Sequence, residues 1–246
     1  MNKKEKKAIV IQARRGSKRL PNKVLADISG KPLLSYVIER VEMSQKIDEI
    51  ILATTTNRED DVLEDLFNDQ NIVVFRGEDE DVLKRFVRLA EERKIDVVVR
   101  ITADCPLIDY QIVDLVLQLY ENEKADYIYI DGYPRGLADV ELLSYKALKQ
   151  SELETDKTQN CYREHVVTYI LDHPEKFKLK ITSAPLKFCR EKYRFCVDEM
   201  SDLKLVRMIY EHFLPRHDFN LEEIIAYVDK NPELAKINQN VKQKTA

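Results

Sequence analysis

The 246-residue chain contains only five glycines, and none has the spacing of a familiar phosphate-binding loop. The sequence has neither the G-x-x-x-x-G-K-[ST] loop of P-loop NTPases nor the G-x-G-x-x-G fingerprint of dinucleotide-binding domains. A phosphate site in this protein must therefore be built from another kind of loop.

Long apolar runs are also missing. The first run after the basic start is Ala8–Ile11, four residues, whereas a signal peptide needs at least about seven and a membrane span about 20. The formal net charge is only −4, which gives no overall field that would indicate nucleic acid or a membrane surface as a partner. We therefore expect a cytoplasmic protein that binds neither.

The cysteines give no sign of a metal centre or a disulfide framework. Cys105, Cys161, Cys189 and Cys196 form no C-x-x-C pair, and the four histidines are scattered. The spacing argues against a zinc site and favours reduced cysteines, as in cytoplasmic proteins.

Short β-rich runs alternate with longer segments of helical periodicity over the first 131 residues. The predicted strands are Ala8–Ile11, Ile50–Ala53, Ile72–Phe75, Val97–Ile101 and Tyr127–Ile130. The predicted helices are Leu33–Met43, Glu59–Asn68, Asp81–Arg93 and Ile112–Asn122. This alternation predicts an α/β fold, a Rossmann-like and mostly parallel sheet with helices on both faces.

The alternation changes after residue 131. We predict a loop at Gly132–Gly136, strands at Val140–Ser144, Phe177–Thr182 and Tyr193–Val197, and helices at Cys161–Asp172 and Leu203–Phe213. We interpret residues 131–200 as an elaboration of a single domain that spans 1–236. A flexible polar tail is expected over 237–246.

The segment Gln12–Lys23, directly after the first predicted strand, is the strongest functional signal. Five cationic side chains fall within ten residues with no acid among them: Arg14, Arg15, Lys18, Arg19 and Lys23. Gly16 and Ser17 allow backbone N–H groups to turn toward an anion, and open α/β sheets bind ligands in loops at strand carboxyl ends. The position favours phosphate binding over the alternative, a solvated basic turn.

The run Ile9–Lys23 resembles the signature of the cytidylyltransferase family, which includes the CMP-sialate and CMP-Kdo synthetases. The resemblance is greatest to the branch typified by the spore-coat polysaccharide protein SpsF. Similar segments follow in order across residues 8–213: Gly30–Leu34, Ala53–Asn57, Phe75–Leu83, Val99–Leu107, Arg163–Val166 and Val197–Leu203. The resemblance implies a fold of the nucleotide-diphospho-sugar transferase type. It also implies transfer of CMP from CTP to a sugar acid or related acceptor, with release of pyrophosphate, for surface polysaccharide or glycan precursors, by a homodimer.

The resemblance also implies roles for individual residues. Arg14, Lys23 and Asp104 would be catalytic. The nucleotide would be bound by Gln12, Ala13, Arg14, Gly16, Ser17, Arg19, Lys23, Arg76 and Asp81. Asp104 and Asp198 would hold Mg²⁺, because two carboxylates at strand ends facing one crevice suit a hard cation that bridges phosphate oxygens. A purely structural role stays open for the acids at strand ends and for the acidic run at residues 79–81. Acidic side chains are also favoured at helix N-termini, where they interact with the positive end of the helix dipole.

Four residues are candidates for binding the acceptor: Tyr133, Arg135, Arg163 and His165. The sequence departs from relatives at several points near these sites. Arg15 stands where relatives usually carry an apolar residue, Asn22 where glycine is common, and Ala103 where glycine precedes the aspartate. The run 136–141 holds one extra residue, and Glu199-Met200 replaces Thr-Pro.

Three other functions stay open. The acceptor could be a sugar phosphate, a polyol phosphate or a phosphonate. A glycosyltransferase of related fold would bind a nucleotide-sugar and usually carry an Asp-x-Asp motif, which Asp104-Cys-Pro does not supply. A non-catalytic nucleotide-binding protein is the third alternative.

Overall fold

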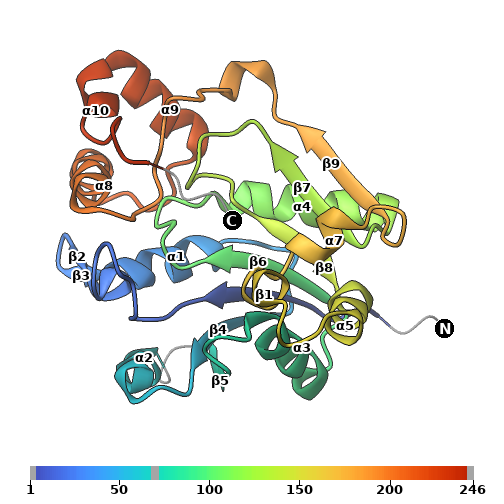
Figure 1. Ribbon diagram of the computed structural model, residues 1–246. Coiled ribbons are helices and arrows are strands. Elements are labelled where there is room, and N and C mark those ends of the chain that lie inside the picture. The colour runs from blue at the N-terminus through green and yellow to red at the C-terminus, as the bar shows by residue number, and fades with distance from the viewer. Residues whose placement is uncertain (1–3, 68–71, 243–246) are drawn as a thin grey trace.

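The structure is a computed structural model that describes residues 4–67 and 72–242. Within these residues a seven-stranded sheet has the order β5-β4-β1-β6-β8-β7-β9 (Figure 1). Its strands are β1 (Lys7–Gln12), β4 (Glu49–Thr55), β5 (Val73–Gly77), β6 (Val97–Thr102), β7 (Tyr127–Asp131), β8 (Glu141–Ser144) and β9 (Leu179–Ser183). Only β8 runs antiparallel to its neighbours β6 and β7, so the predicted mostly parallel sheet is confirmed.

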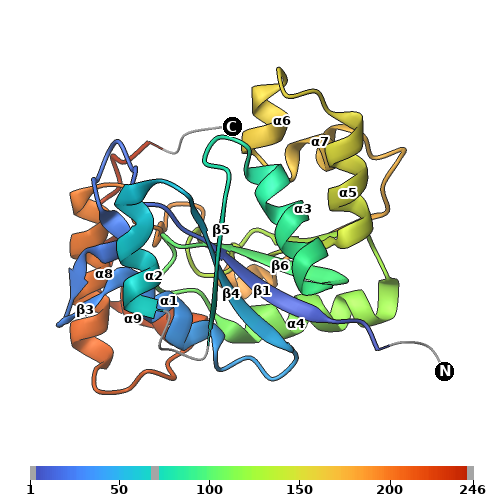
Figure 2. The same ribbon diagram turned by 90° about the horizontal axis from the view of Figure 1, so that it is seen from below.

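Helices cover both faces of the sheet, as Figure 2 shows from below. One face carries α3 (Val82–Arg93), α5 (Tyr145–Glu154), α6 (Asn160–Glu164) and α7 (Thr168–Asp172). The other carries α1 (Leu33–Val41), α2 (Asp61–Phe67), α4 (Tyr110–Glu123), α8 (Met200–Phe213), α9 (Leu221–Lys230) and α10 (Pro232–Lys236). Short elements complete the chain: η1 (Lys23–Leu25), η2 (Arg58–Asp60), η3 (Leu186–Phe188) and the hairpin of β2 (Asp27–Ile28) and β3 (Lys31–Pro32).

The strand β1 shows why its apolar run is continuous. Ile9 and Ile11 pack into the core that contains α1 and α4, whereas Ala8 and Val10 pack into the core beneath α3. A central strand of a parallel sheet is buried on both faces, so both sets of alternate side chains must be apolar. The carboxyl ends of β1 and β6 point toward the side on which α8 and the β2–β3 hairpin lie (Figure 1).

Two predicted elements of the second half are wrong. The helix expected at Cys161–Asp172 is two short helices, α6 and α7, because His165 has an extended backbone that interrupts the helical hydrogen bonds. The strand expected at Tyr193–Val197 is not formed. This segment makes a single bridge from Arg194 to Arg135, a loop residue, because it follows a loop and not another strand. Helices α5, α9 and α10 were not predicted.

The chain near its C-terminus is packed rather than free where it is described. Asn238, inside the expected flexible tail, is buried and donates hydrogen bonds to Arg194 O at 2.9 Å and Asp202 Oδ1 at 2.7 Å. The remainder of that tail, 243–246, lies outside the described residues, as does Asn68 at the end of the second predicted helix.

Candidate active site

The basic loop forms one wall of a cavity of about 380 Å³ at the carboxyl ends of β1 and β6, here called the loop cavity. Its lining residues are Gln12, Ala13, Arg14, Gly16, Ser17, Lys18, Arg19, Lys23, Val24, Thr102, Ala103, Asp104, Glu164 and Asp198. The structure thus brings together every predicted nucleotide-binding residue of the loop and both predicted metal ligands. Arg76 and Asp81 do not line it.

Lys23, one of the lining residues, joins the two predicted metal ligands. Its ammonium group donates hydrogen bonds to Asp104 Oδ2 at 2.8 Å, Asp198 Oδ1 at 3.0 Å and Val197 O at 3.0 Å. Burial lowers the pKa of Lys23, but the attraction of Asp104 and then Asp198 outweighs it, so that the pKa is raised overall. Lys23 therefore remains a cation that holds the two carboxylates together.

The two carboxylates are themselves fixed by further donors. Asp104 Oδ1 accepts a hydrogen bond from Thr102 Oγ1 at 2.7 Å, and Asp198 pairs with Arg19 at 2.8 Å and with Arg194. Burial by itself raises the pKa of each carboxyl. The positive charge and hydrogen bonds of Lys23 lower the pKa by more than burial raises it, so both pKa values lie below the ordinary range. Both groups are therefore anionic at neutral pH.

The donor set fits a magnesium ion that binds together with a nucleotide. Among residues 4–67 and 72–242, no cluster of three or more His, Cys, Asp or Glu side chains could hold a metal by itself. Mg²⁺ is commonly bound by one or two carboxylates, with phosphate and water oxygens completing its coordination. Asp104 and Asp198 supply two such carboxylates, and the loop cavity has room for phosphates beside them.

Arg15 and Asn22, the two departures within the basic loop, bind each other. Arg15 Nε donates to Asn22 Oδ1 at 2.9 Å, and the Arg15 guanidinium also donates to Glu59 O at 2.6 Å. Asn22 has φ of 58°, a left-handed backbone conformation that asparagine tolerates better than most residues. Arg15 therefore ties the loop to η2 and is not among the residues that line the cavity.

Arg14 and Arg76 are both held by acids on the β4–β5 side. Arg14 pairs with Asp79 at 2.9 Å and keeps part of its surface exposed in the cavity. Arg76 donates to Thr55 O at 2.9 Å and to Glu64 of α2 at 3.0 Å. Arg76 thus connects the end of β4 to α2.

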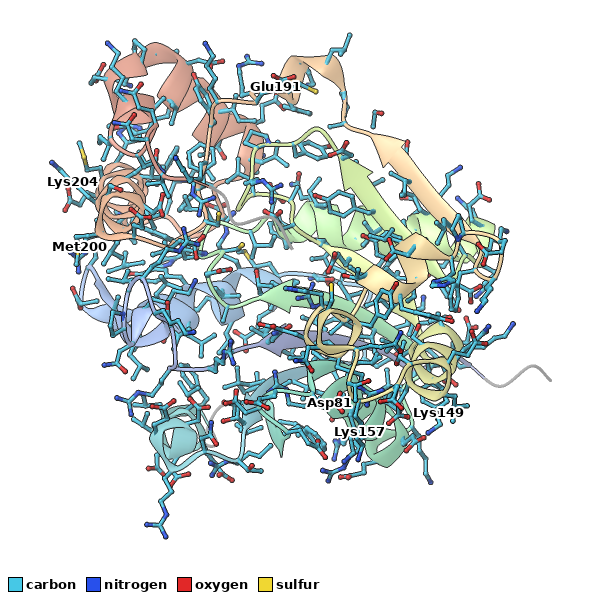
Figure 3. The ribbon with its side chains drawn as sticks, in the orientation of Figure 1. Asp81, Lys149, Lys157, Glu191, Met200 and Lys204 are labelled. Carbon is cyan, nitrogen blue, oxygen red and sulfur yellow. The ribbon has the colours of Figure 1, made fainter. Side chains whose placement is uncertain are left out.

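Asp81 and Arg163, predicted to serve the nucleotide and the acceptor, form a salt bridge with each other. Asp81 lies at the start of α3 (Figure 3) and caps it by accepting a hydrogen bond from Lys84 N at 3.0 Å. Arg163 of α6 is buried and donates to both Asp81 oxygens, at 2.9 and 2.6 Å. The pair therefore fixes α6 against α3, and it places the neighbouring Glu164 on the loop cavity.

A second cavity, of about 530 Å³ and here called the sheet cavity, adjoins the first. Both are lined by Thr102, Asp104 and Asp198. The further lining residues of the sheet cavity come mainly from β6, β7, β8 and the 131–139 loop: Arg100, Cys105, Tyr127, Tyr129, Asp131, Arg135, Asp139, Glu141, Leu171, Ile181 and Cys196. The two predicted metal ligands therefore lie where the two cavities meet.

Of the predicted acceptor-binding residues, only Arg135 lines the sheet cavity. Tyr133 stacks on Phe188, with ring centroids 5.9 Å apart. It lines two other pockets and neither the loop cavity nor the sheet cavity. Arg163 is buried in its salt bridge with Asp81. His165 lies half-buried between α6 and α7 and lines neither cavity.

Several residues at the site were not predicted from the sequence. Arg100 donates to Gln12 Oε1 at 3.1 and 3.0 Å and pairs with Glu141, which connects the two cavities. Arg100 could have been found from the sequence, because it is a charged residue inside the otherwise apolar run Val97–Ile101. Arg194 and Asp139 had no such signal, because their positions depend on how loops fold back onto the sheet.

Known proteins share the sequence and the fold of this chain. The profile of the family described as Cytidylyltransferase matches residues 8–232. This chain belongs to the cytidylyltransferase family. The spore coat polysaccharide biosynthesis protein SpsF of Bacillus subtilis is 33% identical over 230 residues, which cover 92% of this chain and 95% of that protein.

Two further relatives extend the comparison. A cytidylyltransferase structure from Leptospira borgpetersenii is 30% identical and superposes with a TM-score of 0.86, covering 98% of this chain and 100% of that one. The 3-deoxy-manno-octulosonate cytidylyltransferase of Francisella tularensis is 37% identical over 114 residues, 45% of this chain and 44% of that protein. The predicted family and fold are thereby confirmed. None of the helices in the described part of the chain has the length and apolar character needed to cross a membrane.

Proposed function

We propose that this cytidylyltransferase moves CMP from CTP to a sugar acid and releases pyrophosphate, in the synthesis of surface polysaccharide or glycan precursors. One observation carries the proposal: the loop cavity and the sheet cavity meet at Asp104 and Asp198. A nucleotide held on one side of these carboxylates would present its α-phosphate to an acceptor on the other side. Family membership and the 3-deoxy-manno-octulosonate cytidylyltransferase relative support CTP and a sugar acid as the substrates.

The side chains of the loop would bind the triphosphate. Arg14 and Arg19 supply charge-assisted donors, and the backbone turn at Gly16–Ser17 lines the same cavity. All three donors of Lys23 are engaged with oxygen acceptors, so Lys23 can bind a phosphate only by releasing one of them. Release of Asp104 or Asp198 would also free an oxygen of that carboxylate for Mg²⁺.

The reaction is an in-line displacement at the α-phosphorus. The bond from the acceptor oxygen to phosphorus forms as the bond to the pyrophosphate oxygen breaks, and the acceptor proton passes to solvent. Mg²⁺ bound through Asp104 and Asp198 would supply Lewis-acid neutralisation of the phosphate charge. Arg14 and Lys23 would stabilise the negative charge that develops on the leaving pyrophosphate.

The sheet cavity favours a sugar acid over a phosphorylated acceptor. Its cationic lining residues are Arg100 and Arg135, and Arg100 is already paired with Glu141. Asp131 and Asp139 line the same space, so a phosphate carrying up to two negative charges would meet more carboxylate than cation. A single sugar carboxylate can be matched by Arg135 alone.

Pyrophosphate release tests the proposal. The purified protein with Mg²⁺ and CTP should release pyrophosphate with at least one acid from a panel of sugar acids, and Asp104→Asn should abolish the release. Asp65→Asn, an exposed acid on α2, serves as the matched control. A thermal-shift comparison of the four nucleoside triphosphates should show a selective response to CTP, because a ligand that binds only the folded state raises stability.

Two outcomes would contradict the proposal: no pyrophosphate with any acid although the protein is folded, or a response to another nucleotide that exceeds the one to CTP. We also propose a cytoplasmic homodimer, and light scattering after size-exclusion chromatography tests the oligomeric state.

A further inference from the structure

The charges that line the sheet cavity do not balance. Glu141 is paired with Arg100 and Asp104 with Lys23, while Asp198 is paired with Lys23, Arg19 and Arg194. Each of these three acids therefore has a cation of the chain as its partner. Two lining acids are left without an ion pair among the described residues, Asp131 and Asp139, and one lining cation, Arg135.

Arg135 and Asp139 are presented by one rigid loop. Gly136 N–H donates to Asp139 Oδ2, and Arg135 O accepts a hydrogen bond from Phe195 N at 2.7 Å. Leu137 O accepts from Asp109 N at 2.8 Å. Gly136 lies so close to the backbone of 195–196 that a Cβ there would collide with it. The loop therefore fixes a cation and a carboxylate on the same cavity.

The carboxylates face the cavity with free hydrogen-bonding capacity. Asp139 Oδ1 and both oxygens of Asp131 have no hydrogen-bond donor among the residues that the structure describes. An ionised carboxylate can only accept hydrogen bonds, so a ligand group that contacts these oxygens has to be a donor. The Arg135 guanidinium has only donors, and among the described residues it makes no side-chain hydrogen bond or salt bridge. Its charge nevertheless acts on Asp139: burial raises the pKa of this carboxyl, and the hydrogen bond from Gly136 N–H and the positive charge of Arg135 oppose that rise.

A ligand that matches this cavity carries charges of both signs. A sugar acid with hydroxyl groups alone would satisfy Arg135 but would add its negative charge beside two unpaired carboxylates. A sugar acid that also carries a protonated amine has no net charge and offers a cationic donor to Asp131 and Asp139. Attraction between opposite charges favours the amino acid form of the sugar, and repulsion between like charges disfavours the form without the amine. Such charge matching affects the choice between ligands more than the affinity for any one ligand.

We propose that the acceptor is an amino sugar acid, whose carboxylate binds Arg135 and whose ammonium group binds Asp139 and Asp131. This inference rests on the proposed CMP transfer and narrows its acceptor.

A matched pair of acceptors tests the proposal. The acids 3-deoxy-manno-octulosonate and 8-amino-3,8-dideoxy-manno-octulosonate differ in one substituent, a hydroxyl or an amine. With saturating CTP and Mg²⁺ at pH 7, kcat/KM for the amine should exceed kcat/KM for the alcohol by about tenfold or more, because a hydrogen bond between charged groups is the stronger kind. Pyrophosphate release is the readout for both.

Variants locate the effect within the cavity. Asp139→Asn keeps an oxygen for Gly136 N–H but removes the charge, so the preference for the amine should fall several-fold, and Asp131→Asn should act in the same direction. Arg135→Gln should lower kcat/KM for both acceptors by the same factor. Asp65→Asn, remote on α2, should leave both values unchanged.

The outcomes separate this inference from the proposed function. Equal or better turnover of the alcohol by the unchanged protein would overturn the amine proposal and leave CMP transfer in place. A preference for the amine that survives in both Asp→Asn variants would also overturn it. No pyrophosphate with either acceptor, despite a thermal shift with CTP, would overturn the acceptor class, and no shift with CTP would overturn the donor as well.

Discussion

The salt bridge between Asp81 and Arg163 should be a major source of stability for the α3–α6 contact. Arg163 has 5% of its surface exposed and donates two hydrogen bonds to Asp81, at 2.9 and 2.6 Å. It makes two more, at 3.2 Å each, to Glu152 O and Thr155 Oγ1. Hydrogen bonds to charged groups contribute about 1.5–3 kcal/mol each, so the two to Asp81 alone set a scale of about 3–6 kcal/mol.

Arg163→Met keeps much of the apolar stem and removes the charge. Asp81 retains 19% side-chain exposure and its bond to Lys84 N, so water and the helix cap relieve part of the cost of losing its partner. We expect the free energy of unfolding to fall by about 2–4 kcal/mol, at the lower side of the range for breaking a buried pair. Asp81→Asn should cost a similar amount, because it leaves the more deeply buried Arg163 without its anion.

Urea unfolding followed by circular dichroism measures these changes, and the double variant decides their cause. If the two side chains act as a pair, the double variant should lose less free energy than the sum of the single variants, by more than about 1 kcal/mol. Lys84→Met is the matched control on the same helix, since its salt bridge with Glu78 is partly exposed and should contribute less than about 1 kcal/mol. Strictly additive losses, or single losses no larger than the control, would refute the reasoning.

Three smaller predictions follow from the loops. Lys23→Met should lower kcat/KM for CMP transfer by about a hundredfold or more in a pyrophosphate-release assay, on the scale of losing one preorganised electrostatic contact; retained activity would remove Lys23 from the mechanism. Gly136→Ala should unfold at clearly lower urea than Gly30→Ala, because both have positive φ but only Gly136 meets backbone within contact distance; equal midpoints would contradict the steric argument. Asn22→Ala should lose about 1 kcal/mol of unfolding free energy in the same assay, whereas Asn22→Gly should lose less, because only alanine is strained at φ of 58°; the reverse order would contradict it.

The sequence predicts the loop cavity well because its residues are local to strand ends. Gln12–Lys23 follows β1, Asp104 follows β6, and parallel strands bring their carboxyl ends to one edge. Asp198 could not be placed by that rule, since the strand expected before it is absent. It reaches the cavity because Asp202 accepts hydrogen bonds from the Asp198 and Glu199 N–H groups, each at 2.9 Å, at the start of α8.

Contacts between residues far apart in the chain account for what the sequence does not reveal. Asp81 and Arg163 are 82 positions apart, and each has a plausible role when considered alone: a helix cap and a phosphate- or carboxylate-binding cation. Only the folded chain shows that each satisfies the other. The same holds for Arg194, which reaches Asp198 from a segment whose backbone is held by the 135 loop.

The contacts of the basic loop explain two of the departures expected from the family pattern. Arg15 and Asn22 are seven positions apart and are joined by a hydrogen bond, so the two changes compensate each other: the asparagine keeps the left-handed turn that glycine would allow, and its side chain accepts from the arginine. Because Arg15 is thereby directed to Glu59 O and is not among the residues that line the cavity, Arg14, Arg19 and Lys23 are the cationic residues of the loop, with Lys18, that do line it. The arginine at 15 and the asparagine at 22 therefore change how the loop is supported and leave the cationic lining of the loop cavity in place.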